Sequence, residues 1–193
     1  TQGLAGVTNG AAGFDGVNDA VNLDASSIAG AWTAEFIVSK QGQEDAGSLV
    51  RSDPPGGALR LDQWNNTGEV GFTAFGVADY LFDTNYSAPL DEFIHLTFVG
   101  EPLDGVTLFV NGEEAGSNPN FVPLHLFEIG GPDAANMILD EFVVFDRALG
   151  QQEIFDHALA AGLVVPEPSA IAIWSLIGFG LLSFAYYRIA KQK

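Results

Sequence analysis

The chain contains no cysteine, so neither a disulfide framework nor a thiolate site is available to it. Basic residues are also few: seven Lys and Arg stand against 25 Asp and Glu, which gives a formal net charge of −18 at pH 7. This charge repels phosphate backbones and excludes nucleic acid as a partner. Apolar runs long enough to span a bilayer are missing before residue 165.

The abundant residue types indicate one globular domain, followed by a C-terminal tail of different composition. Hydrophobic residues make up 47% of the chain, with 23 Gly and 15 Phe. Before the C-terminal tail the chain is long enough for one domain with a sizeable core. Many glycines beside many aromatic residues are typical of short strands joined by tight turns. We therefore expect an all-β domain over residues 1–161.

Alternating apolar residues predict strands through most of this domain. In residues 31–39, the side chains of Trp32, Ala34, Phe36 and Val38 fall on one pleat face. Turn residues recur about every ten positions, the spacing of an all-β sandwich. Further strands are expected at residues 58–62, 70–75, 93–99, 106–110, 124–129 and 138–145.

Two local signals are more specific than the strand pattern. Asn111-Gly112 between two strands predicts a two-residue hairpin loop, because a type I′ turn needs positive φ at both positions. The apolar stripe of Ile154, Phe155, Ala158 and Leu159 predicts a closing helix. Gly150 is its expected N-cap, with Glu153 reaching back to the cap amide, and Gly162 is its expected stop.

Taken in order, these pieces resemble the laminin-G-like branch of the concanavalin-A-like sandwiches. The resemblance rests on residues 14–23, 33–40, 93–98, 108–112 and 129–154, which include Phe-Asp-Gly-Val-Asn, Leu-Phe-Val-Asn-Gly and Leu-Asp-Glu-Phe segments. It implies a two-sheet jelly-roll sandwich that binds glycan or protein, often with calcium at a rim. The ligand itself is not implied, since one fold hosts unrelated functions.

The resemblance gives candidate calcium ligands. Asp15, Asp19 and Asp140 stand in the stretches that supply carboxylates in calcium-binding relatives, and calcium prefers several convergent oxygens. No contiguous calcium loop is present. A second interpretation stays open, in which these residues bond backbone amides at turns.

Glycan contacts are expected from aromatic side chains beside polar ones: Trp64, Asn65, Tyr80 and Tyr86. These side chains could equally pack inside the domain. No catalytic residue is expected, because the Glu-x-Asp-x-x-Glu strand of the β-glucanases of this fold is absent. The adjacent Asp140 and Glu141 would point to opposite faces of a strand.

The last 29 residues read as a membrane-targeting tail. Pro166, Glu167 and Pro168 lie in a linker over residues 162–169, before an uncharged apolar run over residues 170–187 and a basic end over residues 188–193. As a helix the run would extend ~27 Å, enough to cross a bilayer. This arrangement resembles the PEP-CTERM sorting signal of bacterial exported proteins, which implies recognition by an exosortase.

The flanking charges predict how the span is oriented. Arg188, Lys191 and Lys193 follow the run, whereas all 25 acidic residues precede it, so the C-terminus is expected in the cytoplasm. The body would then lie in the periplasm, on a single-pass protein of the bacterial inner membrane. A chain that begins at Thr1 fits removal of a signal peptide.

One face of the expected span carries mostly small side chains. Ser175, Gly178, Leu182 and Ala185 follow helical spacing, which would let another helix approach closely. Ordinary exposure to lipid explains the same residues.

Three functions remain open from the sequence. The favoured one is a non-catalytic, membrane-anchored scaffold, an accessory subunit that contacts lipid and other integral-membrane subunits of a respiratory or photosynthetic type of complex. The alternative is a cell-surface lectin-like module for exopolysaccharide. The third, a glycan hydrolase, lacks a recognisable pair of carboxylates.

Overall fold

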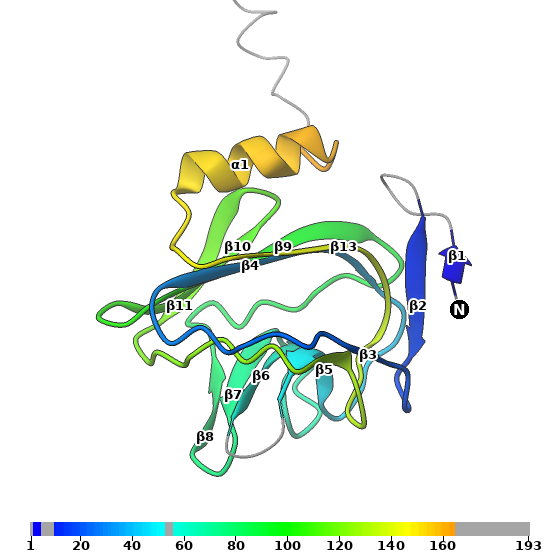
Figure 1. Cartoon of the computed structure of the whole chain (residues 1–193). Helices are drawn as coiled ribbons and strands as arrows, with labels where there is room; N and C mark the ends of the chain where they lie inside the picture. Colours follow the sequence, from blue (N-terminus) through cyan, green and yellow to red (C-terminus); the bar gives the residue numbers. More distant parts are fainter. Residues whose placement is uncertain (1, 5–9, 53–55, 165–193) are drawn as a thin grey trace, which may run out of the picture.

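A computed structural model of the chain describes residues 2–4, 10–52 and 56–164. Two antiparallel sheets lie face to face, and a short helix crosses the outside of one of them (Figure 1). This arrangement confirms the expected two-sheet β-sandwich with one closing helix.

The larger sheet has seven strands and lies under the helix (Figure 1). All its neighbouring strands are antiparallel, and strands from both ends of the domain meet in it. In spatial order it contains β1 (Gln2–Leu4), β2 (Ala11–Asp15), β13 (Asn136–Phe145), β4 (Trp32–Lys40), β9 (Phe93–Glu101), β10 (Gly105–Val110) and β11 (Glu113–Asn118).

The smaller sheet has six strands, and a larger share of its paired strands are consecutive in the sequence than in the larger sheet. Its second half is a meander in which β5 to β8 follow each other in space as in sequence. In spatial order it contains β3 (Ala20–Asn22), β12 (Glu128–Gly130), β5 (Gly47–Arg51), β6 (Gly57–Asp62), β7 (Gly71–Ala74) and β8 (Ala78–Leu81).

The core fills the space between the sheets. Trp32, Ala34, Phe36 and Val38 of β4 all face it and are fully buried, as their alternation predicts. Every residue of β4 is buried, so its opposite face is covered as well, on the side of the sheet where α1 lies (Figure 1). A central strand covered on both faces therefore carries polar side chains such as Glu35 in a dry environment, and these need partners.

Asn111 and Gly112 form the two-residue loop between β10 and β11, with φ angles of 50° and 81°. Both values are positive, so the predicted hairpin is confirmed. Glycine is needed at the second position for a further reason. A Cβ on Gly112 would lie 2.8 Å from the Cα of Phe155, so the hairpin could not approach the helix as it does.

The helix α1 (Gln151–Ala160) begins and ends where the sequence predicts. The amide of Gly150 donates to Oε2 of Glu153 over 3.3 Å. Gly162 follows the last turn with a φ of 73°, which a residue with a side chain adopts only with strain. Of the predicted apolar stripe, Ile154 and Ala158 are fully buried, whereas Leu159 is exposed at the edge.

The predicted tail features fall on residues 165–193, outside the described ranges. They include the sorting motif at Pro166, Glu167 and Pro168, the span over residues 170–187, and its small-residue face. Within residues 2–4, 10–52 and 56–164, no helix is long and apolar enough to cross a membrane. The anchor and its orientation therefore stay predictions.

Candidate functional site

The outer face of the six-stranded sheet carries a line of polar side chains, because alternation along its strands sends apolar ones inward. In β6, Leu59 and Leu61 face the core and Arg60 lies between them on the other face. Thr73 of β7 pairs with Asp79 of β8, next to the inward-facing pair of Phe72 and Tyr80. Three adjacent strands thus place a cation, a hydroxyl and a carboxylate side by side.

These side chains line an open groove of about 390 Å³. Its walls include Arg60, Thr73, Asp79 and Asp133 and the aromatic side chains of Trp64 and Phe75. The groove therefore combines hydrogen-bonding groups with flat apolar surfaces, the mixture that ligand sites use for orientation and contact area.

Arg60 is buried in the floor of the groove. Its Nη1 donates to the carbonyl of Ala46 over 3.1 Å, and its Nη2 lies 3.8 Å from Oδ2 of Asp133. Its guanidinium carbon lies 5.9 Å from the ring centroid of Phe75. Among the described residues, Nε of Arg60 has no hydrogen-bond partner. A buried donor without a partner is costly, and the folded chain bears this cost at Nε of Arg60.

A hydrogen-bond network fixes the geometry of the groove. The buried Gln63 donates through Nε2 to the carbonyls of Phe72 and Tyr80, at 2.9 and 3.0 Å. The hydroxyl of Thr73 lies 2.7 Å from Oδ1 of Asp79 and 3.1 Å from Oε1 of Gln63. The same Gln63 oxygen accepts the amide of Trp64 over 2.8 Å. Gln63 therefore attaches the turn that carries Trp64 directly to β7 and β8, the strands that carry Thr73 and Asp79.

The expected glycan contacts divide into two groups. Trp64 is 55% exposed at the edge of the groove, and Asn65 follows it in the same turn with a φ of 73°. Tyr80 instead stacks on Phe72 with ring centroids 4.9 Å apart, on the core side of the sheet. Tyr86 also packs against the core, where burial raises the pKa of its hydroxyl. Of the four expected residues, the structure therefore places only Trp64 in the lining of the groove, and Asn65 is its neighbour in the turn.

Sequence reasoning missed most of the groove, namely Arg60, Thr73, Phe75, Asp79 and Asp133. One signal was present: a charged residue between two core leucines, Leu59 and Leu61, marks the outer pleat face of a strand. It could not indicate which other side chains lie across the sheet from it.

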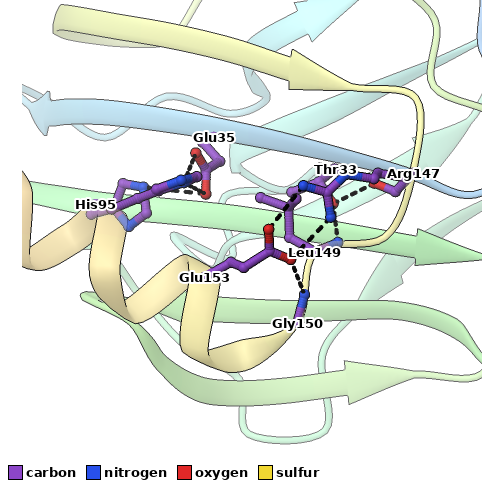
Figure 2. A network of polar contacts seen from close by, with 8 residues as sticks. Thr33, Glu35, His95, Arg147, Leu149, Gly150 and Glu153 are labelled. Carbon is purple, nitrogen blue, oxygen red and sulfur yellow. Dashed lines mark hydrogen bonds and ion pairs between the residues drawn. The ribbon is translucent and has the colours of Figure 1, made fainter.

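A second polar cluster lies between α1 and the seven-stranded sheet (Figure 2). The buried carboxylate of Glu35 accepts a hydrogen bond from Nδ1 of His157, at 2.9 Å from Oε2. Nε2 of His95 lies 3.7 Å from the other Glu35 oxygen. Burial raises the pKa of Glu35, and the hydrogen bond from His157 opposes that rise. The three side chains come from β4, α1 and β9, so they fasten the helix to the sheet.

The N-terminal end of α1 is fastened separately, as Figure 2 shows. The Thr33 hydroxyl donates to the carbonyl of Arg147 over 2.9 Å and accepts the amide of Leu149 over 3.0 Å. Arg147 also forms a bidentate ion pair with Glu153, in which Nη1 donates to Oε2 and Nη2 to Oε1, each over 2.9 Å. These hydrogen bonds lower the pKa of Glu153 to about 2. Both ends of the helix are thus held, and we assign this cluster to the docking of α1.

The stability of the domain is expected to fall in mild acid because of His95. Burial, and to a lesser degree the charge of His157, lower the pKa of His95 from 6.5 to about 4. Between these values the unfolded state takes up the proton and the native state does not. The free energy of unfolding should therefore decrease as the pH falls through this window, by on the order of 3 kcal/mol.

The comparison is urea unfolding of the wild type and His95→Gln at several pH values between 7 and 4. Glu35, whose raised pKa contributes in the opposite direction, is retained in both proteins. We expect a smaller loss of stability on acidification in the variant. Equal losses would show that His95 takes up its proton as readily in the native state as in the unfolded one.

The three candidate calcium ligands are not assembled into one site. Oδ1 of Asp15 accepts the amide of Val17 over 3.0 Å, and Oδ2 of Asp19 accepts the amide of Asp15 over 3.1 Å. Asp15 lies opposite Asn136, whereas Asp140 lies about 13 Å further along β13 at ~3.3 Å per residue. Across the described ranges, no group of three His, Asp or Glu side chains could hold a metal ion.

Calcium is accordingly expected to leave the thermal unfolding midpoint unchanged. A cation that bound only the folded state would raise the midpoint in proportion to the logarithm of its concentration. The measurement is a thermal melt in excess calcium and in excess chelator. A calcium-dependent rise that Asp15→Asn abolishes would contradict this arrangement of the three carboxylates.

The sequence model of one protein family, the concanavalin A-like lectin/glucanases superfamily, matches residues 15–155 of this chain. The chain belongs to this superfamily. The expected family is therefore confirmed, and with it the jelly-roll sandwich. No curated protein matches the chain in sequence.

Several solved structures have a sandwich similar to that of this chain. Domain 4 of AbnA, a GH43 extracellular arabinanase from Geobacillus stearothermophilus solved with arabinotriose, is 20% identical with a TM-score of 0.64. The match covers 82% of this chain and 81% of that domain. At this identity the likeness concerns the fold.

Two others match over a smaller part of their own length. A putative carbohydrate binding protein from Bacteroides ovatus is 15% identical with a TM-score of 0.54, over 72% of this chain and 43% of that one. The sialidase of Trypanosoma rangeli is 17% identical with a TM-score of 0.56, over 77% of this chain. The sandwich spans only 27% of that enzyme.

Proposed function

We propose that this protein is a non-catalytic glycan-binding module and that the groove on the outer face of the six-stranded sheet is its binding site. The observation that carries the proposal is the exposed indole of Trp64 at the edge of a hollow with a polar floor. Likeness in fold to domain 4 of the arabinanase, which was solved with arabinotriose, supports the same class of ligand.

The groove has chemistry suited to a sugar ring. An indole face can pack against the apolar C–H face of a ring, while the ring hydroxyls bond to side chains at its edge. Asp79 and Asp133 supply acceptors and Arg60 supplies donors. Because the chain has a net charge of −18, we expect it to prefer neutral glycans over uronic or sulfated ones.

The contacts of the groove carboxylates support a proposal of binding without hydrolysis. A glycosidase needs one carboxyl group to give a proton to the leaving oxygen and a second carboxylate across the bond. Here Asp79 accepts the hydrogen bond of Thr73, and Asp133 lies beside the Arg60 guanidinium. Both act as acceptors, so we propose a binding role and no enzymatic one.

The predicted tail would determine where such a module acts. If residues 170–187 span the inner membrane, the groove is displayed on its periplasmic side, where exopolysaccharide passes. The groove favours this lectin-like role over that of an accessory subunit. The accessory subunit needs a protein partner, and it remains the second expectation from the sequence.

The test is a glycan array probed with the folded chain, followed by calorimetric titration of the strongest ligand and an assay for released reducing ends. We expect saturable binding of a neutral oligosaccharide, without dependence on calcium and without hydrolysis. Failure to bind any glycan, with circular dichroism confirming a folded protein, would overturn the proposal.

A further inference from the structure

Lys40 and Asp62 form a charged pair in the interior of the protein. Their side chains are 3% and 0% exposed, and Nζ of Lys40 donates directly to Oδ1 of Asp62. Lys40 is the last residue of β4 in the seven-stranded sheet, and Asp62 is the last residue of β6 in the six-stranded sheet. The pair therefore joins the two sheets, and the glycan-binding groove does not include it.

Both residues are held in place by their backbones. Lys40 pairs with Met137 of β13, and its carbonyl accepts the amide of Asp91 over 2.8 Å. Asp62 pairs with Gly47 of β5. Since the strands fix both backbones, the amine and the carboxyl group are kept in contact, which is how a protein gains the high effective concentration of an intramolecular reaction.

The surroundings of the carboxyl group are tightly packed. A Cβ on Gly47 would lie 3.1 Å from Ala135 and 3.2 Å from Oδ2 of Asp62, so even a methyl group there would require its neighbours to shift. Oδ2 accepts the amide of Glu44 over 3.3 Å. A backbone amide in this position can stabilise negative charge that develops on the oxygen when the carbonyl carbon is attacked.

Burial also opposes a negative charge on the Asp62 carboxyl group. Removing two charges from water costs several kcal/mol for each ion before their attraction offsets it. Burial raises the pKa of Asp62, while the hydrogen bond from Lys40 opposes that rise. Transfer of one proton from the ammonium to the carboxylate gives an amine beside a carboxylic acid, the two reactants of amide formation.

We propose that Lys40 and Asp62 are the site of an intramolecular amide cross-link between the two sheets. Nζ of Lys40 attacks Cγ of Asp62 and forms an N–C bond. The C–OH bond then breaks, and the hydroxyl leaves with a second proton from the nitrogen as water. The products are one secondary amide and one water molecule, so no oxidant, reductant or other reactant is needed.

The cross-link would replace two buried charges by one neutral amide. It would also give this cysteine-free chain a covalent tie between its sheets. As with a disulfide, such a tie restricts the unfolded chain and stabilises the fold. The inference is independent of glycan binding, since none of the groove residues takes part.

The direct test is the intact mass of the full chain, measured after purification and again after prolonged incubation in the folded state. We expect a mass lower than that of the sequence by one water molecule. Lys40→Arg is the matched control, because it keeps the positive charge and lacks the amine, so it should keep the full mass. A wild-type mass equal to the sequence mass at both times would overturn the proposal.

Tryptic digestion under denaturing conditions locates the bond. Without a cross-link, cleavage after Lys40, Arg51, Arg60 and Arg147 gives separate peptides 1–40 and 61–147. With it, cleavage after Lys40 is lost and peptide 1–51 is joined to peptide 61–147. Loss of water through cyclisation at Asp15-Gly16 or Asp104-Gly105 would lower the mass equally but leave these peptides separate, and that result would also overturn the proposal.

A further variant tests the chemistry itself. In Asp62→Asn the leaving group is ammonia, so the cross-linked variant should reach the same final mass as the cross-linked wild type. Retention of the full mass by Asp62→Asn, with the wild type one water lighter, would contradict attack at this carbon.

Discussion

Replacing Trp64 by alanine is expected to weaken glycan binding by about 2 kcal/mol, roughly a 30-fold rise in Kd. The indole is the largest exposed aromatic surface at the groove, and its loss removes the face against which a sugar ring would pack. Calorimetric titration of the array-selected oligosaccharide measures the change. Trp64→Phe should lose less, because it keeps an aromatic face.

The matched control is Leu103→Ala. Leu103 is 96% exposed in the turn between β9 and β10 and does not line the groove. Its truncation should leave both affinity and stability within ~0.5 kcal/mol of the wild type. Equal effects of the Trp64 and Leu103 variants on binding would argue against the groove as the glycan site.

The largest loss of stability is expected from Trp32→Ala, at about 3–5 kcal/mol. Trp32 is fully buried at the start of β4, and its indole donates to the carbonyl of Val122 over 2.9 Å. Truncation leaves both a cavity and a buried carbonyl without its partner. Gly100 lies so close to the ring that a Cβ there would be 2.3 Å from it, so the neighbouring strand is shaped around this side chain.

Urea unfolding followed by circular dichroism measures this loss, with Trp32→Phe as a smaller truncation at the same place. Glycan affinity of the folded fraction should not change, because Trp32 faces the core and the groove lies on the outside of the other sheet. A loss below ~1 kcal/mol would mean that Trp32 is not a central residue of the core.

Several elements could be predicted because local physics determines them. The alternation of Trp32, Ala34, Phe36 and Val38 encodes a core face by itself. The positive φ angles required between β10 and β11 restrict the loop to residues such as Asn-Gly. The helix start and stop depend on residues within one turn of its ends.

The groove could not be predicted because strand pairing assembles it. Arg60 and Asp133 come from segments far apart in the chain, and they meet only through the order of the strands. The same limit applies to Tyr80, because its exposure depends on which pleat face of β8 the pairing with β7 turns toward the core. Sequence shows that these side chains are present but not which face of a sheet they share.

The most direct test of the proposed function uses the indole N–H signals of the chain's three tryptophans in a nuclear magnetic resonance titration with the selected oligosaccharide. We predict a saturable shift of the Trp64 signal at the affinity found by calorimetry, while the signal of the buried Trp32 stays in place. Saturable binding that leaves the Trp64 signal unmoved would contradict the assignment of the groove as the glycan site.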